Sequence, residues 1–253
     1  MKNAKQKKSN SSKYWKSRAY FQAQAGIDKP GFTLTCRPED NLDHVAKDVC
    51  IMLENITESL VNCDDDEITL EDELRNVRNK AFDICHRSSA SKQNVFIKCD
   101  SSDLLLKITD VVYSTESMMN HHLKVYPVRL VPVLWTCRAI QNLAIDLINK
   151  SMVPFMESLM NETKQYQIQV KSTRNTNLSK DVVFDMICHS LRSKGYERVN
   201  SSECTASCPC VYCHVQQKRF CLTLLPKFNE RCSYNLLAFQ DKLKQQRSVN
   251  SLS

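Results

Sequence analysis

Glycine is nearly absent from this sequence, since the 253 residues contain only Gly26, Gly31 and Gly195. A dinucleotide-binding fingerprint, a P-loop or a glycine-rich kinase loop needs several glycines close together, because the backbone must approach phosphate with no side chain in the way. The sequence therefore excludes these loops and argues against a Rossmann-type methyltransferase. A GxSxG nucleophile elbow and an HExxH metal motif are also absent.

Long apolar runs are missing as well, so the sequence predicts no membrane partner. The N-terminal residues are polar and basic without an apolar core, and we therefore expect no secretory signal. An intracellular compartment keeps thiols reduced, which favours free thiols or metal ligands over disulfides for the thirteen cysteines.

Positive charge is what the sequence has in excess, with a net charge of +7 that is concentrated in the N-terminal residues. Residues 1–30 are polar and basic, and we interpret them as a disordered tail. Basic side chains beside aromatic rings suit RNA, because the charges meet phosphates and the rings stack on bases. The alternative is a solubilising tail with nuclear-localisation character. The candidate RNA-binding residues of the tail are Lys13, Tyr14, Trp15, Lys16 and Arg18.

The first half of the chain predicts a compact α+β unit over residues 31–120. Apolar spacing of three or four predicts helices, and short β-rich runs predict strands. A unit with this order of strands and helices is plausibly ferredoxin-like. The expected elements are a strand at 31–36, a helix at 42–60, a helix at 70–86, a strand at 94–99 and a helix at 101–114 that Ser101 or Ser102 caps.

The second half predicts another α+β unit over residues 121–228, followed by a polar and frayed tail at 229–253. Prolines at 127 and 132 suggest an edge or bent strand. The expected elements are a strand at 123–133, a helix at 137–159 capped by Thr136, a strand at 166–170, a loop at 171–178, a helix from Ser179 to Leu191, and a hairpin of 209–216 with 219–226.

Four cysteines and a histidine lie close together at residues 204–214. Tetrahedral zinc needs four ligands, and a strong signal has two separated CxxC knuckles. Here every candidate lies in one segment, and the strand predicted there places Cys210 and Cys213 on opposite faces. We therefore favour a structural role and expect no metal, with a zinc-dependent interaction module as the alternative. That module would use Cys204, Cys208, Cys210 and Cys213.

Cys137 is the candidate for a reactive thiol. It stands beside Arg138 at an expected helix start, where the thiol pKa would be lowered. No histidine is paired with it in the sequence, so nucleophilic catalysis is weakly supported.

A basic loop between a strand and a helix start is a good place for phosphate, because the first N–H groups of a helix have no intrahelical partner. The loop before the helix at 179–191 fits this description, and the start of the helix expected at Thr136 is a second such place. The candidate RNA-binding residues are Lys171, Arg174, Asn175 and Lys180 in the first place, and Thr136 and Arg138 in the second.

Several segments resemble one family when taken in order. They are GFTLTC at 31–36, NVFIKC at 94–99, VRLVPVLWTCRA at 128–139 and YQIQVKSTRNTNLSKDVV at 166–183. Together they look like the THUMP-domain adaptor of the tRNA cytidine acetyltransferase, over about residues 12–228. Two departures stand out. Trp135 replaces a usual glycine, and in the loop at 171–175 either the arginine is displaced by one place or the loop has one extra residue.

This resemblance implies a ferredoxin-like N-terminal domain followed by a THUMP domain. It implies a tRNA-binding protein without catalytic activity that presents tRNA to an RNA cytidine acetyltransferase for N4-acetylcytidine formation, in the nucleus or nucleolus and also in the cytoplasm. No cofactor and no small-molecule substrate would then belong to this chain. The alternatives are an RNA-binding module for another tRNA-modification enzyme and the zinc-dependent module described above.

Overall fold

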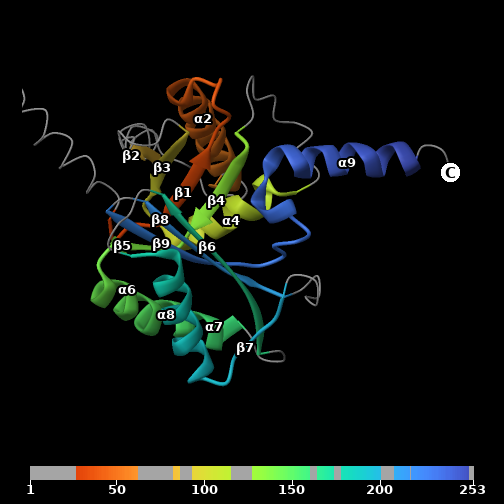
Figure 1. Cartoon of the computed structure of the whole chain (residues 1–253). Coiled ribbons are helices and arrows are strands. Elements are labelled where there is room, and N and C mark those ends of the chain that lie inside the picture. The colour runs from red at the N-terminus through yellow and green to blue at the C-terminus, as the bar shows by residue number, and fades with distance from the viewer. Residues whose placement is uncertain are drawn as a thin grey trace, which may run out of the picture.

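The computed structural model describes residues 27–61, 82–85, 93–114, 127–159, 164–173, 178–200, 208–216 and 218–250. These residues form a mixed α+β structure with two sheets (Figure 1). The N-terminal tail that we expected to be disordered lies outside them, except for residues 27–30. The expected domain boundary near residue 121 lies outside them too, and it stays a prediction. No helix among the described residues has the length and apolar character needed to span a membrane.

The first sheet contains β1 (Gly31–Thr35), β2 (Phe82–Cys85), β3 (Asn94–Cys99) and β4 (Arg129–Val133) in the order β2-β3-β1-β4, and all its pairs are antiparallel. Helices α2 (Leu42–Val61) and α4 (Ser102–Val112) pack against it, with their apolar faces in the same core as the strands. Within the described residues the elements run strand, helix, strand, strand, helix, strand. The sequence predicted a second helix where β2 lies and assigned the strand that contains β4 to the second unit, so the expected order agrees only in part. Burial of each large apolar side chain here stabilises the fold by about 1.5–3 kcal/mol.

Two local features explain part of this sheet. A Cβ on Gly31 would lie 2.2 Å from the carbonyl oxygen of Ile97, so the close approach of β1 to β3 requires glycine there. The predicted helix at 70–86 is wrong at its C-terminal end, because Phe82–Cys85 is strand β2. Phe82 is buried and its ring centroid lies 6.4 Å from that of Phe32, so pairing with β3 outweighs the local helical spacing.

The second sheet has the order β5-β9-β8-β6-β7. β6 runs parallel to both β8 and β7, whereas β9 runs antiparallel to β8 and β5. The predicted β8–β9 hairpin and the strand predicted at 166–170 are confirmed. The loop predicted at 171–178 is wrong at its start, because Lys171, Ser172 and Thr173 continue that strand and pair with residues 214–216. The strands are β5 (Trp135–Arg138), β6 (Gln165–Thr173), β7 (Glu197–Arg198), β8 (Cys210–Gln216) and β9 (Arg219–Leu225).

Helices cover one face of this second sheet, and the first sheet packs on the other. Val211, Cys213 and Val215 of β8 share a core with the helices, whereas the intervening Cys210 and Tyr212 belong to the core of the first sheet. The period of two in a strand produces this division. The covering helices are α6 (Gln141–Leu147), a π-helical turn (Ile148–Met152), α7 (Val153–Leu159) and α8 (Lys180–Arg192).

The helix expected from Cys137 begins later than predicted. Residues Trp135–Arg138 pair with β9 as strand β5, and the helix starts at Gln141 after the N-cap Ile140. The prediction that Thr136 caps this helix is therefore wrong. The π-helical turn ends one residue before Val153–Pro154, at Met152. Pro154 has no backbone N–H to donate, and its ring would clash with the carbonyl of the preceding turn.

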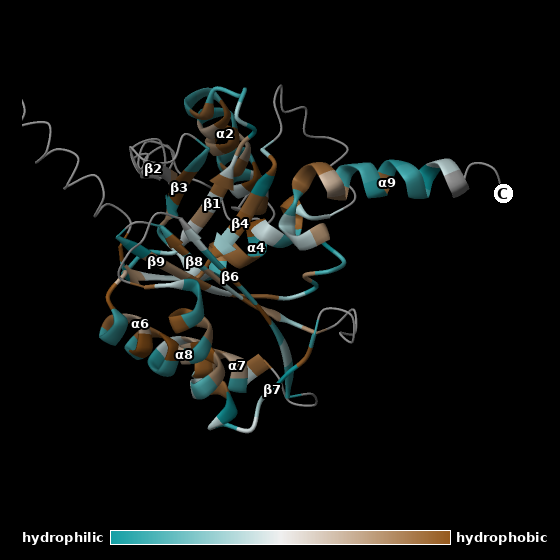
Figure 2. Cartoon of the chain, viewed as in Figure 1, coloured by the Kyte–Doolittle hydropathy of each residue, from teal (hydrophilic) through white to brown (hydrophobic). Residues whose placement is uncertain are grey.

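The polar tail expected from residue 229 is also corrected. Helix α9 (Leu236–Asn250) follows a short 3-10 turn (Cys232–Tyr234), and Tyr234, Leu236, Phe239 and Leu243 are buried in the core of the first sheet. Figure 2 shows α9 as hydrophobic where it begins and hydrophilic further along, where it extends away from the rest of the molecule. The apolar pattern of this segment is too short for the sequence alone to distinguish a helix from a frayed end.

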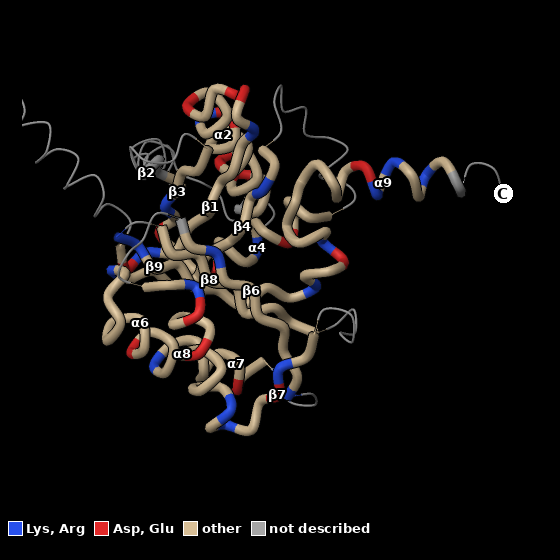
Figure 3. The backbone as a smooth tube through the Cα atoms, in the orientation of Figure 1, with Lys and Arg blue, Asp and Glu red and all other residues tan. Residues whose placement is uncertain are grey.

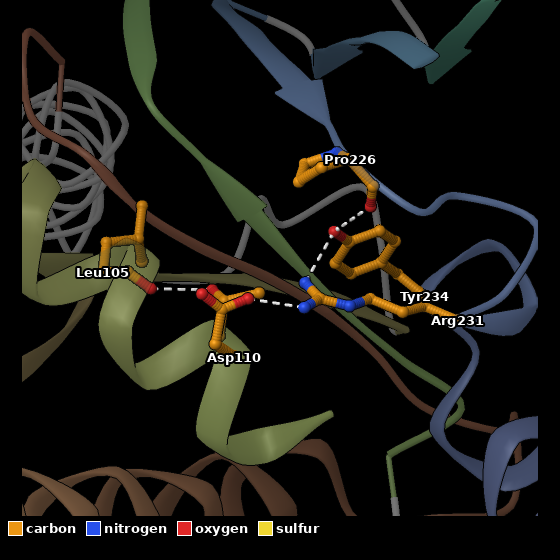
Figure 4. A network of polar contacts seen from close by, with 6 residues as sticks. Leu105, Asp110, Pro226, Arg231 and Tyr234 are labelled. Carbon is orange, nitrogen blue, oxygen red and sulfur yellow. Dashed lines mark hydrogen bonds and ion pairs between the residues drawn. The ribbon is translucent and has the colours of Figure 1, made fainter. Parts of the chain in front are cut away.

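A polar network attaches this C-terminal segment to α4 (Figure 4). The guanidinium of Arg231 pairs with the carboxylate of Asp110 and donates to the hydroxyl of Tyr234 at 3.0 Å. The Tyr234 hydroxyl in turn donates to the carbonyl of Pro226 at 2.9 Å. Arg231 is buried, and the carboxylate of Asp110 compensates its charge within the fold.

Candidate nucleic-acid interface

The register of the second sheet brings the two predicted basic segments to the same end. Arg138, the last residue of β5, pairs with Arg219, the first residue of β9. Arg219 pairs with Gln216 at the end of β8, which in turn pairs with Thr173 at the end of β6. Neighbouring strands lie about 4.8 Å apart, so β5 and β6 are separated by about 14 Å at this end. The two segments therefore form one surface.

This end of the sheet carries a group of cations on different elements. Arg138, Lys180 and Lys218 are exposed, and Lys171 is half-buried near the end of β6. Figure 3 shows Lys and Arg positions gathered near the label of β9. Arg219 is different, because it is buried and its guanidinium stacks at 4.5 Å from the ring centroid of Phe96. Three exposed cations with a fourth behind them suit a polyanion such as the RNA backbone.

The start of α8 completes this surface. The Ser179 hydroxyl accepts a hydrogen bond from the backbone N–H of Val182 at 3.2 Å, which confirms the predicted N-cap. Leu178 is fully buried and anchors the chain just before the helix. Lys180 is therefore held at the positive end of the helix dipole, where an anion is favoured, although Asp181 in the same turn opposes an anion.

Lys171 is the cation with the most unusual surroundings. Its Nζ lies 5.7 Å from the ring centroid of Tyr212 on β8. Burial, together with the nearby charge of Arg129, lowers the Lys171 pKa to about 8. On the neighbouring strand His214 pairs with Lys171 in register, and burial followed by the charge of Lys171 lowers the His214 pKa to about 4. His214 is therefore neutral at physiological pH, and its ring nitrogen Nδ1 lies 3.0 Å from the Gln216 amide nitrogen.

Thr136 has a structural position. Its side chain is 2% exposed, and its hydroxyl accepts from the Lys29 N–H at 3.1 Å and donates to the Lys29 carbonyl at 2.9 Å. It ties the chain entering β1 to strand β5. The structure therefore gives the Thr136 hydroxyl a buried protein partner and not a place on the basic surface, unlike its neighbour Arg138.

The remaining candidate residues lie outside the described residues. These are Arg174 and Asn175 of the loop before α8, and Lys13, Tyr14, Trp15, Lys16 and Arg18 of the N-terminal tail. Their roles stay predictions.

Two cations of this region were not predicted from the sequence. Lys218 lies in the β8–β9 turn, and the hairpin itself, once predicted, was the signal that could have placed it at the end of the sheet. Arg129 begins β4 and approaches Lys171 from the other sheet. Only the packing of one sheet on the other brings these two together, so no local signal identifies Arg129.

A pocket with a volume of about 490 Å³ adjoins Arg138. Ile27, Leu143 and Leu147 contribute apolar walls, and Lys150 in the lining pairs with Asp146 at 3.2 Å. The pocket therefore places a hollow of mixed polarity beside the basic surface.

The cysteine segment does not converge on one point. Cys210 belongs to the core between the sheets and Cys213 to the core under the helices, which confirms that the two face opposite sides of β8. Burial raises the pKa of Cys213 well above its usual value. Among the described residues, no group of three or more His, Cys, Asp or Glu side chains is placed to hold a metal ion, and Cys204 lies outside them.

Cys137 is not activated by its neighbour Arg138. Burial raises the Cys137 pKa to about 12, and the charges of Asp28 and Cys221 add to this effect. The expectation of a lowered pKa is wrong, because Cys137 lies inside a strand and not at a helix start.

Comparisons with known proteins give distant structural similarities. No protein-family model matches the chain, and no curated protein matches it significantly. Solved structures that resemble it include PH1313 from Pyrococcus horikoshii, with a TM-score of 0.48, 10% identity, and coverage of 78% of this chain and 55% of that one. A predicted N6-adenine-specific DNA methylase from Listeria monocytogenes gives a TM-score of 0.40, 11% identity, and coverage of 81% and 41%.

A third structure is a 4-thiouridine synthetase in complex with RNA and ATP, with a TM-score of 0.42, 5% identity, and coverage of 79% of this chain and 42% of that one. The chain thus spans roughly half the length of each of these proteins. Similarities at this level establish neither a family nor a function, so the function is argued from the basic surface.

Proposed function

We propose that this chain is an RNA-binding protein that engages tRNA through the basic end of its second sheet. The observation that carries the proposal is the strand register, which places Arg138 of β5 and Lys171 of β6 at the same end of one sheet. Lys180 and Lys218 add charge from the helix start and the hairpin turn. Phosphate contacts of this kind supply affinity without reading sequence.

We further propose the finer assignment that the resemblance suggests. The chain would be a THUMP-domain adaptor that presents tRNA to an RNA cytidine acetyltransferase for N4-acetylcytidine formation, and would itself be non-catalytic. The strand order β2-β3-β1-β4 supports a ferredoxin-like N-terminal domain in this assignment. A nuclear or nucleolar location fits the basic N-terminal sequence.

Binding is tested by titrating tRNA with the wild type and with a Lys171→Glu, Arg138→Glu double variant. Each charge reversal removes a phosphate contact, so we expect weaker binding and a flatter dependence on salt concentration. Lys107→Glu is the control for charge reversal, because Lys107 is exposed on α4 away from the second sheet; it makes half the charge change of the double variant. An unchanged affinity and salt slope in the double variant would reject the interface.

The adaptor role is tested by nucleoside mass spectrometry of tRNA incubated with the acetyltransferase, with and without this protein. N4-acetylcytidine that depends on the protein, and that falls in the double variant but not in Lys107→Glu, supports the role. Acetylation that proceeds equally without it, while tRNA still binds, favours a module for another tRNA-modification enzyme. Metal analysis of the pure protein separately tests the zinc alternative, against which the opposed faces of Cys210 and Cys213 already argue.

A further inference from the structure

Arg129 and Lys171 lie in different sheets but share one neighbour. Arg129 is the first residue of β4 in the first sheet, and Lys171 lies near the end of β6 in the second. The Lys171 Nζ lies over the ring of Tyr212. Burial raises the pKa of the Tyr212 hydroxyl, and the nearby charge of Arg129 opposes this rise. The two cations therefore lie close together where the sheets meet.

Both cations are half-buried, and neither has an acidic partner among the described residues. Two like charges at such a place repel each other, and partial burial strengthens the repulsion because water screens it less. The lowered pKa of Lys171 reports this cost, since burial and Arg129 are its causes. An anion held between the two side chains would remove the repulsion.

An uncharged polar atom without a partner lies near Lys171. Gln169 precedes Lys171 by two residues on the same face of β6 and pairs with Tyr212 in register. Its side-chain Oε1 is buried without a hydrogen-bond partner among the described residues. The two ends of an amide exchange places by a simple flip, so Gln169 can direct an N–H at an anion.

We propose that Arg129 and Lys171 form a binding site for a phosphate group with two negative charges, a phosphate monoester, where the two sheets meet. A monoester carries a charge between about −1.5 and −2 at neutral pH, whereas a backbone phosphodiester carries only one. The doubly charged group therefore balances the pair, and the planar guanidinium of Arg129 binds two of its oxygens at once. If the protein binds RNA as proposed above, the group is the terminal phosphate of an RNA end; otherwise it is free phosphate.

The test compares one RNA hairpin prepared with a 5′-phosphate, with a 3′-phosphate and with neither, bound to the full-length protein. One charge-assisted contact corresponds to about tenfold in affinity, so we expect the wild type to bind one phosphorylated form about tenfold more tightly than the unphosphorylated one. Arg129→Met and Lys171→Met should abolish this preference, and Lys171→Arg should keep it. Lys180→Met is the control, because it removes a charge from the same surface but not from the pair.

A second measurement separates the two sources of phosphate. Inorganic phosphate should raise the melting temperature of the wild type above that in chloride of equal ionic strength, and should not do so for Arg129→Met or Lys171→Met. Stabilisation by phosphate without any RNA binding supports the site and rejects the proposed RNA function. RNA binding without a preference for a phosphorylated end and without stabilisation by phosphate, in folded variants, supports the RNA function and overturns the site.

Discussion

Arg231 and the Arg129–Lys171 pair show two ways in which this fold treats a positive charge away from water. The Arg231 guanidinium pairs with Asp110 and donates to Tyr234 (Figure 4). It also lies 5.7 Å from the ring centroid of Tyr113. Burial lowers the pKa of Arg231, but its polar partners outweigh that effect and leave the pKa raised. At Lys171, by contrast, burial and a second cation lower the pKa.

This difference distinguishes a cation that stabilises the fold from a cation that is available to bind a ligand. A charge with every partner inside the protein contributes to stability and has little to offer a ligand. A half-buried charge that a neighbouring cation repels costs stability, and perturbed pKa values of this kind cluster at functional sites. The following predictions test this comparison, beginning with the largest expected effect.

Replacing Arg231 with Met should destabilise the protein by about 3 kcal/mol, because it removes both the ion pair with Asp110 and the hydrogen bond that the Tyr234 hydroxyl accepts. The carboxylate of Asp110 is 69% exposed, which keeps the loss below that of a fully buried pair. Urea unfolding measures the free energy of unfolding, and RNA affinity of the folded variant should be unchanged.

The control for this prediction is Lys242→Met. Lys242 donates from its Nζ to the Glu230 carbonyl at 3.0 Å in an exposed position, so its loss should cost at most about 0.5 kcal/mol. If Arg231→Met destabilises no more than this control, the network is not holding the C-terminal segment in place.

Replacing Lys171 with Met should act in the opposite sense. It removes a half-buried cation that faces Arg129, so the free energy of unfolding should stay constant or rise, while RNA affinity falls about tenfold. Calorimetry and RNA titration on the same preparation measure both effects. A variant that loses stability along with affinity would show that Lys171, like Arg231, belongs to the structural framework.

The sequence predicts those parts of this molecule that have local signals. Ser101 and Ser179 act as N-caps because a serine oxygen meets the N–H groups of the next turn, which depends only on neighbouring residues. The β8–β9 hairpin is equally local, since alternating residues flank a short turn. Strands β2 and β5 and helix α9 were missed because contacts with distant segments determine them.

The basic surface likewise has a part that the sequence predicts and a part that it does not. Lys171, Lys180 and Arg138 were proposed one segment at a time, but nothing local shows that they share one end of a sheet. Their common position follows only from the register in which β5 pairs with β9 and β8 pairs with β6. Arg129 was missed for the same reason, because it reaches Lys171 only across the packing of the two sheets.

The pH dependence of RNA binding also tests the difference between Lys171 and Arg231. The pKa of Lys171 in the folded protein is about 8, below the usual 10.5. The charged form therefore lowers the free energy of unfolding at pH values below 8. This loss of stability disappears as pH rises from 8 towards 10.5. RNA needs the charged form, so affinity should fall about fivefold between pH 7 and pH 9. Among the described residues, Arg129, His214 and Tyr212 are titratable groups near Lys171. Burial keeps His214 neutral in this range and raises the pKa of Tyr212 above it.

The matched variant for this experiment is Lys171→Arg, which stays charged throughout the range. Fluorescence anisotropy at constant ionic strength should show that this variant loses the decrease in affinity. If the two proteins respond equally to pH, the titrating group lies in the RNA or elsewhere in the protein.

The smallest effect is expected at Lys180, which is exposed at the start of α8 and outside the Arg129–Lys171 pair. An exposed cation neutralises one phosphate while remaining in water, so Lys180→Met should weaken RNA binding about threefold and reduce the salt slope by about one. Asp181→Asn removes the acid of the same turn and should strengthen binding by a similar factor. Lys194→Met is the matched control, because Lys194 pairs with Glu157 at 3.5 Å and follows the other end of α8. Equal salt slopes for the Lys180 and Lys194 variants would show that Lys180 neutralises no phosphate and would place the RNA away from the start of α8.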